Sequence, residues 1–562
     1  MDRALGQDRA AIAPRGAAAL GPRSRLARFA MVALPLGFLA VFFAYPIITI
    51  LDRGLGRRGR HNVVDLITDG QLRSVVWFTV WQAVVSTVLT LAVGLPAARV
   101  LARYRFAGKA LVRALVVVPF ALPTVVIGSA INALIDRFGL DDGPVRLYHT
   151  TWAILLAHVI FNVAVIVRVV GGYWALLDQR VDESAQMLGA SRWRVFVEID
   201  LPRLRPAITA ASAIVFLFCF TSFGVILLLG GPRQATIESE IWRYAVQRTD
   251  FHTAALLSAF QLAAVVAMVA AATLLERRVG RLAGRSRVTP PRRAATTRER
   301  VALAASLAPT VVLVAMPLAS LVERSLVVRG GHGFDNYRAL GSRERASSSL
   351  LVPPIEAVRN SLVTAAVATI IGLAVGGLAA GAIVYGRRAI ARVLDIGLML
   401  PLGTSAVTLG FGFLIALDDP PLDLRTSWIL IPLAQALVAI PFVVRIVVPA
   451  LRAIDDRLRD SATVLGASPP RVWRNVDWPV AARAASAAAA FAFAISLGEF
   501  GATSFLARPD APTIPIAMFR LLSQPGAALR GMAMALAVIL AALVILATLV
   551  VERLRPRSSV SL

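Results

Sequence analysis

The stretch ESAQMLGASRWRV at residues 183–195 returns as DSATVLGASPPRV at residues 460–472. Gly466 follows Gly189 by 277 residues, and the same spacing relates Pro202 to Pro479, Phe223 to Phe500 and Gly224 to Gly501. Closer to the N-terminus the spacing becomes 282 residues, as for Pro119 with Pro401 and Gly128 with Gly410. Chance matches between two Ala-, Val- and Leu-rich stretches would not keep one constant spacing over so many glycine and proline pairs. The sequence therefore predicts an internal repeat of about half the chain.

Apolar segments accompany the repeat, six in each half. Hydrophobic residues make up 57% of the 562 residues and charged residues 16%, and the mean hydropathy of +0.71 is typical of membrane proteins. Each segment has about the 20 residues that cross a hydrocarbon core. The segments are 29–51, 75–98, 114–135, 151–170, 207–229, 254–275, 301–321, 361–384, 396–417, 428–448, 484–505 and 532–551. We predict an all-α polytopic membrane protein with about 12 transmembrane helices, and the even number per half makes them two parallel six-helix repeats.

Basic clusters orient the chain in the membrane. The tail 1–28, the Arg- and Pro-rich linker 277–300 and the tail 554–562 are predicted to be cytoplasmic, because short cytoplasmic segments carry an excess of Arg and Lys. They bound a first half at 29–276 and a second half at 301–553, with both termini in the cytoplasm. This orientation places Asp136, Asp141 and Asp142 outside the cytoplasm. One basic cluster departs from the rule, because the same orientation also places outside Arg53, Arg57, Arg58 and Arg60.

Charge and cysteine content exclude several classes of protein. The net charge of +26 arises beside apolar segments and without interleaved aromatic residues, which favours membrane-flanking clusters over a nucleic-acid surface. The single cysteine, Cys219, lies inside an apolar segment and offers neither a disulfide nor a thiolate metal site. The chain has no G-x4-G-K-[ST] phosphate loop. We therefore predict a chain that is not an enzyme and holds no cofactor or metal.

The repeated stretch has the features of a short helix at the cytoplasmic mouth. Glu183 or its counterpart stands where it complements the positive end of the helix dipole. Ala185 keeps one face small enough for another protein to approach. Gly189 and Gly466 are predicted to end the helices in the left-handed conformation. The predicted product is a helix with an acidic, small-residue face, and the alternative is an amphipathic interfacial helix packed on the protein's own loops.

Prolines mark further features of the predicted helices. Pro202 and Pro479 are predicted at the entry to the following membrane helix, where a missing N–H costs little. Pro119, Pro123 and Pro401 are predicted to kink the helices that contain them.

Continued to Ile199-x-Leu201-Pro202, the repeated pattern resembles the EAA loop of importer permeases of the ATP-binding cassette (ABC) superfamily. Serine at its second position, Asp460 for glutamate and Trp478 for leucine depart from that pattern. The resemblance implies the type I ABC importer permease fold in a bacterial cytoplasmic (inner) membrane, with an extracytoplasmic solute-binding protein and a separate homodimeric ABC ATPase as partners. The implied ATPase-coupling residues are Glu183, Ser184, Ala185, Gly189, Asp460, Ser461, Ala462 and Gly466.

The fifth apolar segment of each half is predicted to line the solute pathway. The segments contain FLFCFTSFG at 216–224 and FAISLGEFG at 493–501. An acid inside an apolar span is expensive, so Glu499 either contacts a cationic solute or makes an internal hydrogen bond, and we favour the second. His158 and Asn162 are predicted to make contacts between helices rather than to bind a ligand. The pathway candidates are Phe220, Ser222, Phe223, Gly224, Ser496, Glu499, Phe500 and Gly501.

The sequence says less about the solute. The fused halves resemble thiamine and ferric-iron importer permeases, and LAHVIFN at 156–162, CFTSFG at 219–224 and LGGPRQATIE at 229–238 resemble the thiamine type most. We predict thiamine, with ferric iron as the alternative, although the spans contain no His, Cys and carboxylate cluster for iron. A secondary transporter is the alternative class, but it would favour an inverted repeat and intramembrane acidic relays. A non-transporting scaffold would not need a duplicated cytoplasmic loop.

Overall fold

The computed structural model describes residues 23–56, 68–141, 146–231, 233–279, 292–294, 296–346, 349–418 and 422–554. The regular structure within them is helical apart from two short strand pairs. β1 (Tyr104–Arg105) pairs in parallel with β2 (Arg292–Arg293), and β3 (Val327–Val328) pairs antiparallel with β4 (Gly331–His332). Most of the predicted tails and linker lie outside the described residues, as do Arg57, Arg58, Arg60 and Asp142.

Ten helices in the described part of the chain are long and apolar enough to cross a membrane. In the first half they are Phe29–Leu55 (α1, Arg23–Leu39, and α2, Tyr45–Leu55), Gly70–Arg103 (α4), Thr151–Leu176 (α7), Trp193–Phe220 (α9 and α10) and Phe251–Ala271 (in α13, Phe251–Val279). In the second half they are Thr297–Leu326 (α14), Pro354–Tyr385 (α16), Leu430–Arg452 (α19), Pro470–Gly498 (α21 and α22) and Ala527–Val551 (in α25, Ala527–Leu554).

Two further spans are sharply bent pairs of helices. α5 (Lys109–Ala121) meets α6 (Thr124–Phe138) at 111°, and the segment Arg388–Gly403, which begins with α17 (Arg388–Met399), meets α18 (Ala406–Ala416) at 99°. Counting each pair as one span confirms the predicted total of 12. In the first pair Pro123 excludes a helical conformation at Leu122, which is extended. The kink predicted from Pro123 is thereby confirmed.

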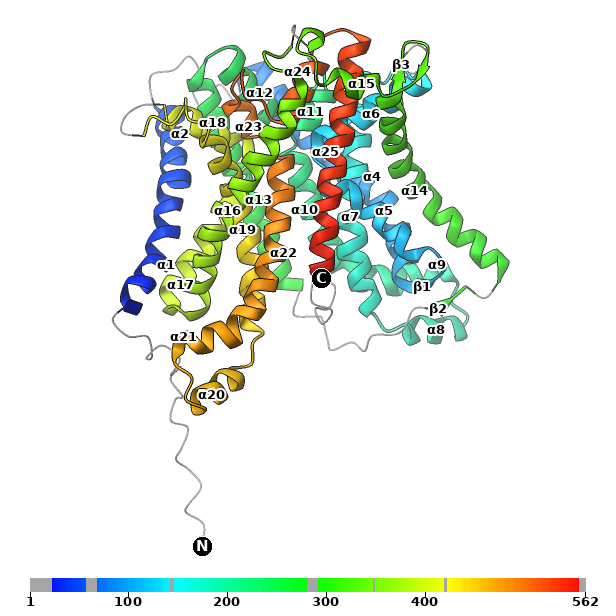
Figure 1. Ribbon diagram of the computed structural model, residues 1–562. Coiled ribbons are helices and arrows are strands. Elements are labelled where there is room, and N and C mark those ends of the chain that lie inside the picture. Colours follow the sequence, from blue (N-terminus) through cyan, green and yellow to red (C-terminus); the bar gives the residue numbers. More distant parts are fainter. Residues whose placement is uncertain are drawn as a thin grey trace.

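The first helix of each half packs on the other half. α1 contacts α16 and α17 of the second half, and α14 contacts α4, α5 and α6 of the first half. Figure 1 shows α1 and α14 at opposite flanks of the molecule. The two halves are therefore interlocked rather than merely joined by the linker.

The repeat is visible in the packing as well as in the sequence. In the first half α4, α7 and α10 pack together, and their counterparts α16, α19 and α22 do the same in the second half. A Cβ added at Gly94 would lie 2.8 Å from Ile166, and one added at Gly376 would lie 2.9 Å from Val443. Glycine at these paired positions lets the helices approach closely, as small residues do in membrane bundles.

The fifth membrane helix of each half begins earlier than predicted. α9 (Arg192–Val195), a π-helical turn (Phe196–Asp200) and α10 (Leu201–Phe220) form one continuous helix. The second half repeats this with α21 (Pro469–Val472), a π-helical turn (Trp473–Asp477) and α22 (Trp478–Gly498). Pro202 and Pro479 stand in the first turn of α10 and α22, as predicted. They do not begin the membrane helix, because the wider π-helical turn before each proline accommodates its ring and its missing N–H inside one continuous helix.

The predicted fifth spans also end sooner than 229 and 505. The first breaks after Phe220 and the second after Gly498. The short helices that follow are α11 (Gly224–Leu229), α12 (Ile237–Trp242), α23 (Thr503–Leu506) and α24 (Ile514–Leu522). The remaining short helices are α8 (Arg180–Met187), α15 (Asp335–Ala339) and α20 (Asp456–Val464). In Figure 1, α11, α12, α23 and α24 lie at one end of the molecule, and α8 and α20 lie at the other.

Candidate coupling and pathway sites

The two short helices α8 and α20 end in the same way. Gly189 has φ +88° and Gly466 has φ +80°, which confirms the predicted left-handed ends. Each end is a Schellman motif, in which two backbone N–H groups close the last turn. The hydrogen bonds are Ala190 N to Ala185 O, Gly189 N to Gln186 O, Ala467 N to Ala462 O and Gly466 N to Thr463 O, each 3.0 Å long.

The side chains that project most from these helices are apolar. Met187 and Leu188 are each 89% exposed, and their counterparts Val464 and Leu465 are 86% and 87% exposed. The predicted acids and serines are exposed too, whereas Ala185 and Ala462 are half-buried. These four side chains are the most exposed apolar feature that the two helices share. The sequence signal was the pair of apolar residues before each glycine, which the predicted acidic, small-residue face did not include.

At the other end of the molecule, Phe223 and Phe500 meet face to face. They are counterparts in the repeat, and their ring centroids are 5.4 Å apart with planes at 23°. Phe223 also contacts Trp242, and Phe500 contacts Phe519. Trp242 and Phe519, again counterparts, pack edge to face at 5.8 Å. We call these four residues the aromatic cluster; they join the two halves where the repeat axis passes between them.

The remaining first-half pathway candidates pack within their own half. Phe220 is buried and stacks on Phe216. Ser222 Oγ lies 2.8 Å from Nε2 of His158, whose Nδ1 lies 3.0 Å from Ser86 Oγ. Asn162 donates to the carbonyl of His158 and to the sulfur of Cys219. These bonds join α4, α7 and the end of α10, as predicted for His158 and Asn162.

The two glycine candidates are positions of close approach. A Cβ added at Gly224 would lie 2.5 Å from Thr124 Oγ1 and 3.3 Å from a ring atom of Phe500. A Cβ added at Gly501 would lie 2.9 Å from that of Ala406. Both glycines therefore allow a bent helix pair, α6 or α18, to pack against the break in a fifth helix.

Glu499 is hydrogen-bonded within its own segment. Its Oε1 accepts from the backbone N–H of Ala502 at 2.7 Å, and its Oε2 accepts from the backbone N–H of Thr503 at 2.9 Å and from the Thr503 hydroxyl. The side chain is buried and caps α23. Ser496, one turn earlier, is also buried, and its Oγ has no partner among the residues that the structure describes.

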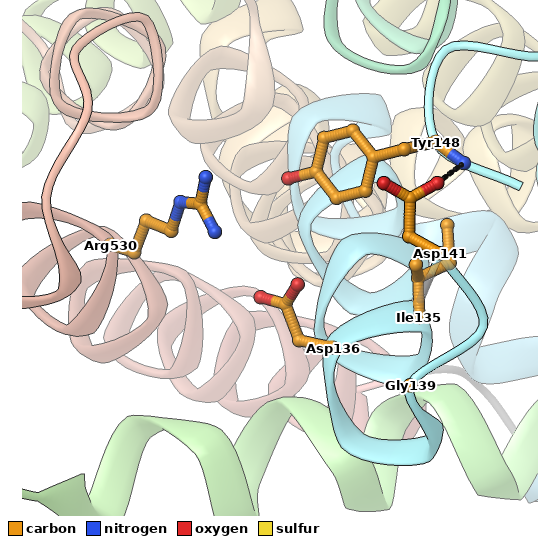
Figure 2. Close-up of a pocket in the computed structure, with 6 residues that line it drawn as sticks. All are labelled: Ile135, Asp136, Gly139, Asp141, Tyr148 and Arg530. Atoms are coloured by element: carbon orange, nitrogen blue, oxygen red, sulfur yellow. Dashed lines mark hydrogen bonds between the residues drawn. The ribbon is translucent and has the colours of Figure 1, made fainter. Parts of the chain in front are cut away.

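A charged cavity of about 280 Å³ lies near the same end of the molecule as the aromatic cluster. It is lined by Ile135, Asp136, Gly139, Asp141, Tyr148 and Arg530. Figure 2 shows the Arg530 guanidinium, the Asp136 carboxylate and the Tyr148 ring directed toward one space. Asp141 accepts a hydrogen bond from the Tyr148 N–H at 3.2 Å. Two of the predicted outward aspartates thus meet an arginine of the second half, on α25.

Metal-binding side chains are dispersed. Within the described ranges, no group of three or more His, Cys, Asp or Glu side chains is placed to hold a metal ion.

A duplicated six-span bundle with a matched pair of short helices at one end is the architecture of a multi-pass transport permease. Residues 90–285 and 368–560 each match the family described as binding-protein-dependent transport system inner membrane component. The chain belongs to this family and carries its domain twice, which confirms the prediction of a fused two-half ABC importer permease in the inner membrane.

Individual relatives extend over different shares of the chain. The chain is similar to the thiamine transport system permease protein ThiP of Brucella melitensis, at 30% identity over 501 residues, which covers 86% of this chain and 88% of the relative. It is similar to ThiP of Salmonella typhimurium at 26% identity over 485 residues, covering 82% and 86%. It is also similar to the sulfate transport system permease protein CysT of Escherichia coli, at 30% identity over 224 residues, covering 39% and 81%.

Proposed function

We propose that this permease imports thiamine from an extracytoplasmic binding protein and is driven by a separate homodimeric ABC ATPase that docks on α8 and α20. Met187 and Leu188, with their counterparts Val464 and Leu465, carry this proposal. Four almost fully exposed apolar side chains, at matched places on two Schellman-capped helices, suit a partner that binds twice. A homodimer has two equivalent surfaces to offer. In this arrangement both chain termini lie in the cytoplasm.

The aromatic cluster supports a gating mechanism at the extracytoplasmic end. Phe223 and Phe500, which stack across the two halves, would close the path between them in this conformation. ATP binding would draw α8 and α20 together and separate the halves at the aromatic cluster, a rigid-body switch of the kind that packed interfaces undergo. The charged cavity lined by Asp136, Tyr148 and Arg530 offers the binding protein a polar contact at the same end.

Two observations support thiamine as the solute. The ThiP relatives cover most of this chain, whereas the sulfate permease relative covers 39% of it. Aromatic rings suit a flat heteroaromatic cation, because the faces of Phe and Trp attract positive charge. No observation in the described ranges favours the ferric-iron alternative.

Charged substitutions at the C-terminal ends of α8 and α20 test the docking sites. Leu188→Asp with Leu465→Asp, and separately Gly189→Arg with Gly466→Arg, should abolish co-purification of the ATPase with the membrane-extracted permease. The matched control is Ser306→Ala on α14, away from both docking helices, which removes only a hydroxyl that bonds to the Ala302 carbonyl of its own helix. Undiminished co-purification of the ATPase with both double variants would refute docking at α8 and α20.

The solute needs its own measurement. Calorimetric titration of the purified binding protein with thiamine, thiamine phosphates and ferric iron should give saturable binding of thiamine. Binding of ferric iron without binding of thiamine would refute thiamine as the solute and favour the ferric-iron alternative.

A further inference from the structure

α8 has no buried side chain of its own, and neither has α20. A helix without a buried apolar anchor passes little motion to the body of a protein unless polar contacts tie it there. The contacts that tie these two helices are therefore the parts that a moving ATPase has to pull on.

In the first half the tie is Arg103, at the end of α4. Its Nη2 lies 2.8 Å from Asp182 Oδ2 on α8 and 3.3 Å from Asp200 Oδ1 in the π-helical turn of the fifth membrane helix. Its Nη1 donates to the Leu177 carbonyl at 3.4 Å. Arg103 and Asp200 are 6% and 1% exposed. One buried guanidinium thus joins α8 to two membrane helices.

In the second half the arginine of this contact lies on the short helix α20 instead of on a membrane helix. The counterpart of Asp200 is the buried Asp477, the counterpart of Asp182 is Arg459, and the counterpart of Arg103 is Tyr385. Arg459, on α20, places its Nε and Nη2 each 2.9 Å from Asp477 Oδ1. Its Nη2 also donates to the Tyr385 hydroxyl at 3.3 Å, and its guanidinium lies over the Tyr385 ring.

The two arrangements share one feature, a buried aspartate that ends the π-helical turn of the fifth membrane helix. A buried carboxylate without a cation is strongly unfavourable, so each half supplies an arginine from one neighbour or the other. In the first half Asp182 then shares the arginine with Asp200, and burial together with the nearby Asp200 charge raises the pKa of Asp182. Arg103 is accordingly the buried cation of that junction, and Arg203, whose Nη1 lies 3.9 Å from Asp182 Oδ1, adds a more exposed one.

We propose that Arg103 and Arg459 are positioning residues that transmit the movement of α8 and α20 to the membrane helices. The proposal rests on the coupling function proposed above for these helices. It assigns the same mechanical link to both halves, with the arginine on a membrane helix in one half and on the coupling helix in the other.

An exchange of side chains tests the link. Arg103→Tyr removes the cation, Asp182→Arg adds a second one, and the two together recreate the second-half arrangement inside the first half. Tyr385→Arg with Arg459→Asp is the reciprocal exchange. Each single variant should break the link, and each exchange should restore it, because the buried aspartate again faces one arginine.

The readout is the ATP-dependent change at both ends of the permease–ATPase complex. Spin labels on cysteines introduced at Ser191 and Ser468 report the approach of α8 and α20, and labels at Arg233 and Asp510 report separation at the opposite end. All four positions are exposed, and each pair are repeat counterparts. In Arg103→Tyr the helices should still approach on ATP, while the population with separated outer labels falls about tenfold or more.

Controls separate this idea from the docking proposal. Arg194→Ala removes an exposed ion pair with Glu198, 3.0 Å long, and should leave the separated population within about twofold of the parent. Undiminished ATPase co-purification with the Leu188→Asp, Leu465→Asp variant would overturn docking at α8 and α20, and is measured separately from the spin-label readout of the link. Normal outer separation in Arg103→Tyr, or an exchange variant no better than its single variants, overturns the link. If Arg103→Tyr is not recovered folded, Asp182→Arg and the exchange decide alone.

Discussion

The first half secures the break in its fifth membrane helix with a histidine from another helix, and the second half secures the same break with a carboxylate from the break itself. Ser222 and Glu499 are counterparts in the repeat. Ser222 bonds to His158 on α7, which also reaches Ser86 on α4. Glu499 instead accepts hydrogen bonds from residues three and four positions later.

The difference teaches which features a repeat retains. The Schellman ends, the π-helical turns and the glycine contacts recur in both halves, because each satisfies a demand of the backbone path. The polar partners differ, because several side chains can satisfy a group that has no water to bond in the membrane. The first break depends on how α4 and α7 pack, whereas the second is self-contained.

The largest effect is expected from Glu499→Ala. The change leaves the N–H groups of Ala502 and Thr503 without their acceptor in a buried place, which should lower the free energy of unfolding by about 3 kcal/mol. Reversible unfolding in mixed detergent micelles measures the loss. Glu499→Gln keeps one acceptor oxygen and should lose about half as much. Unchanged stability with lost uptake of a cationic solute would assign the carboxylate to the solute instead.

Much of this fold could be predicted from the sequence because its signals are local. Apolar length gave the spans, and the constant spacing of glycine and proline gave the repeat. Gly189 and Gly466 predict helix ends by themselves, because glycine adopts the left-handed conformation without strain. Pro123 likewise predicts a kink by itself, although its angle depends on the helices packed around it.

The tertiary features were not accessible in the same way. The exposure of Met187 and Leu188 is an absence of packing, which no local pattern reports. The π-helical turn before Pro202 is a backbone adjustment inside a helix that otherwise has a normal pattern. The link between Arg103 and Asp200 is hidden because its counterpart in the second half has the charges exchanged, so a residue-by-residue comparison of the halves does not pair them.

A smaller effect is expected from His158→Ala. It removes the side-chain bonds to Ser86 and Ser222, whose hydroxyls can turn to carbonyls of their own helices, so the unfolding free energy should fall by about 1–2 kcal/mol. The matched control is Gln435→Ala at the counterpart position. Because Oε1 of Gln435 has no partner among the described residues, its loss should be the smaller of the two. An equal loss at both positions would contradict the claim that His158 on α7 stabilises the break in the fifth membrane helix of the first half.

The smallest effect is expected at the contact between the repeat counterparts Phe223 and Phe500. Phe223→Ala, Phe500→Ala and the double variant form a cycle whose coupling energy should be about 1 kcal/mol, the value of an aromatic pair beyond its buried area. Phe120 packs on Phe161 and Phe218 instead, so a cycle of Phe120→Ala with Phe500→Ala should be additive within about 0.5 kcal/mol.

The same cycle, measured in the complex with bound ATP, sharpens the comparison of the halves. If α8 and α20 pull the aromatic cluster apart, the coupling between Phe223 and Phe500 should fall toward zero in that state, because separated rings no longer interact. Coupling that persists unchanged with ATP bound would mean that these rings are a static contact between the halves. The gate would then have to lie elsewhere along the fifth helices.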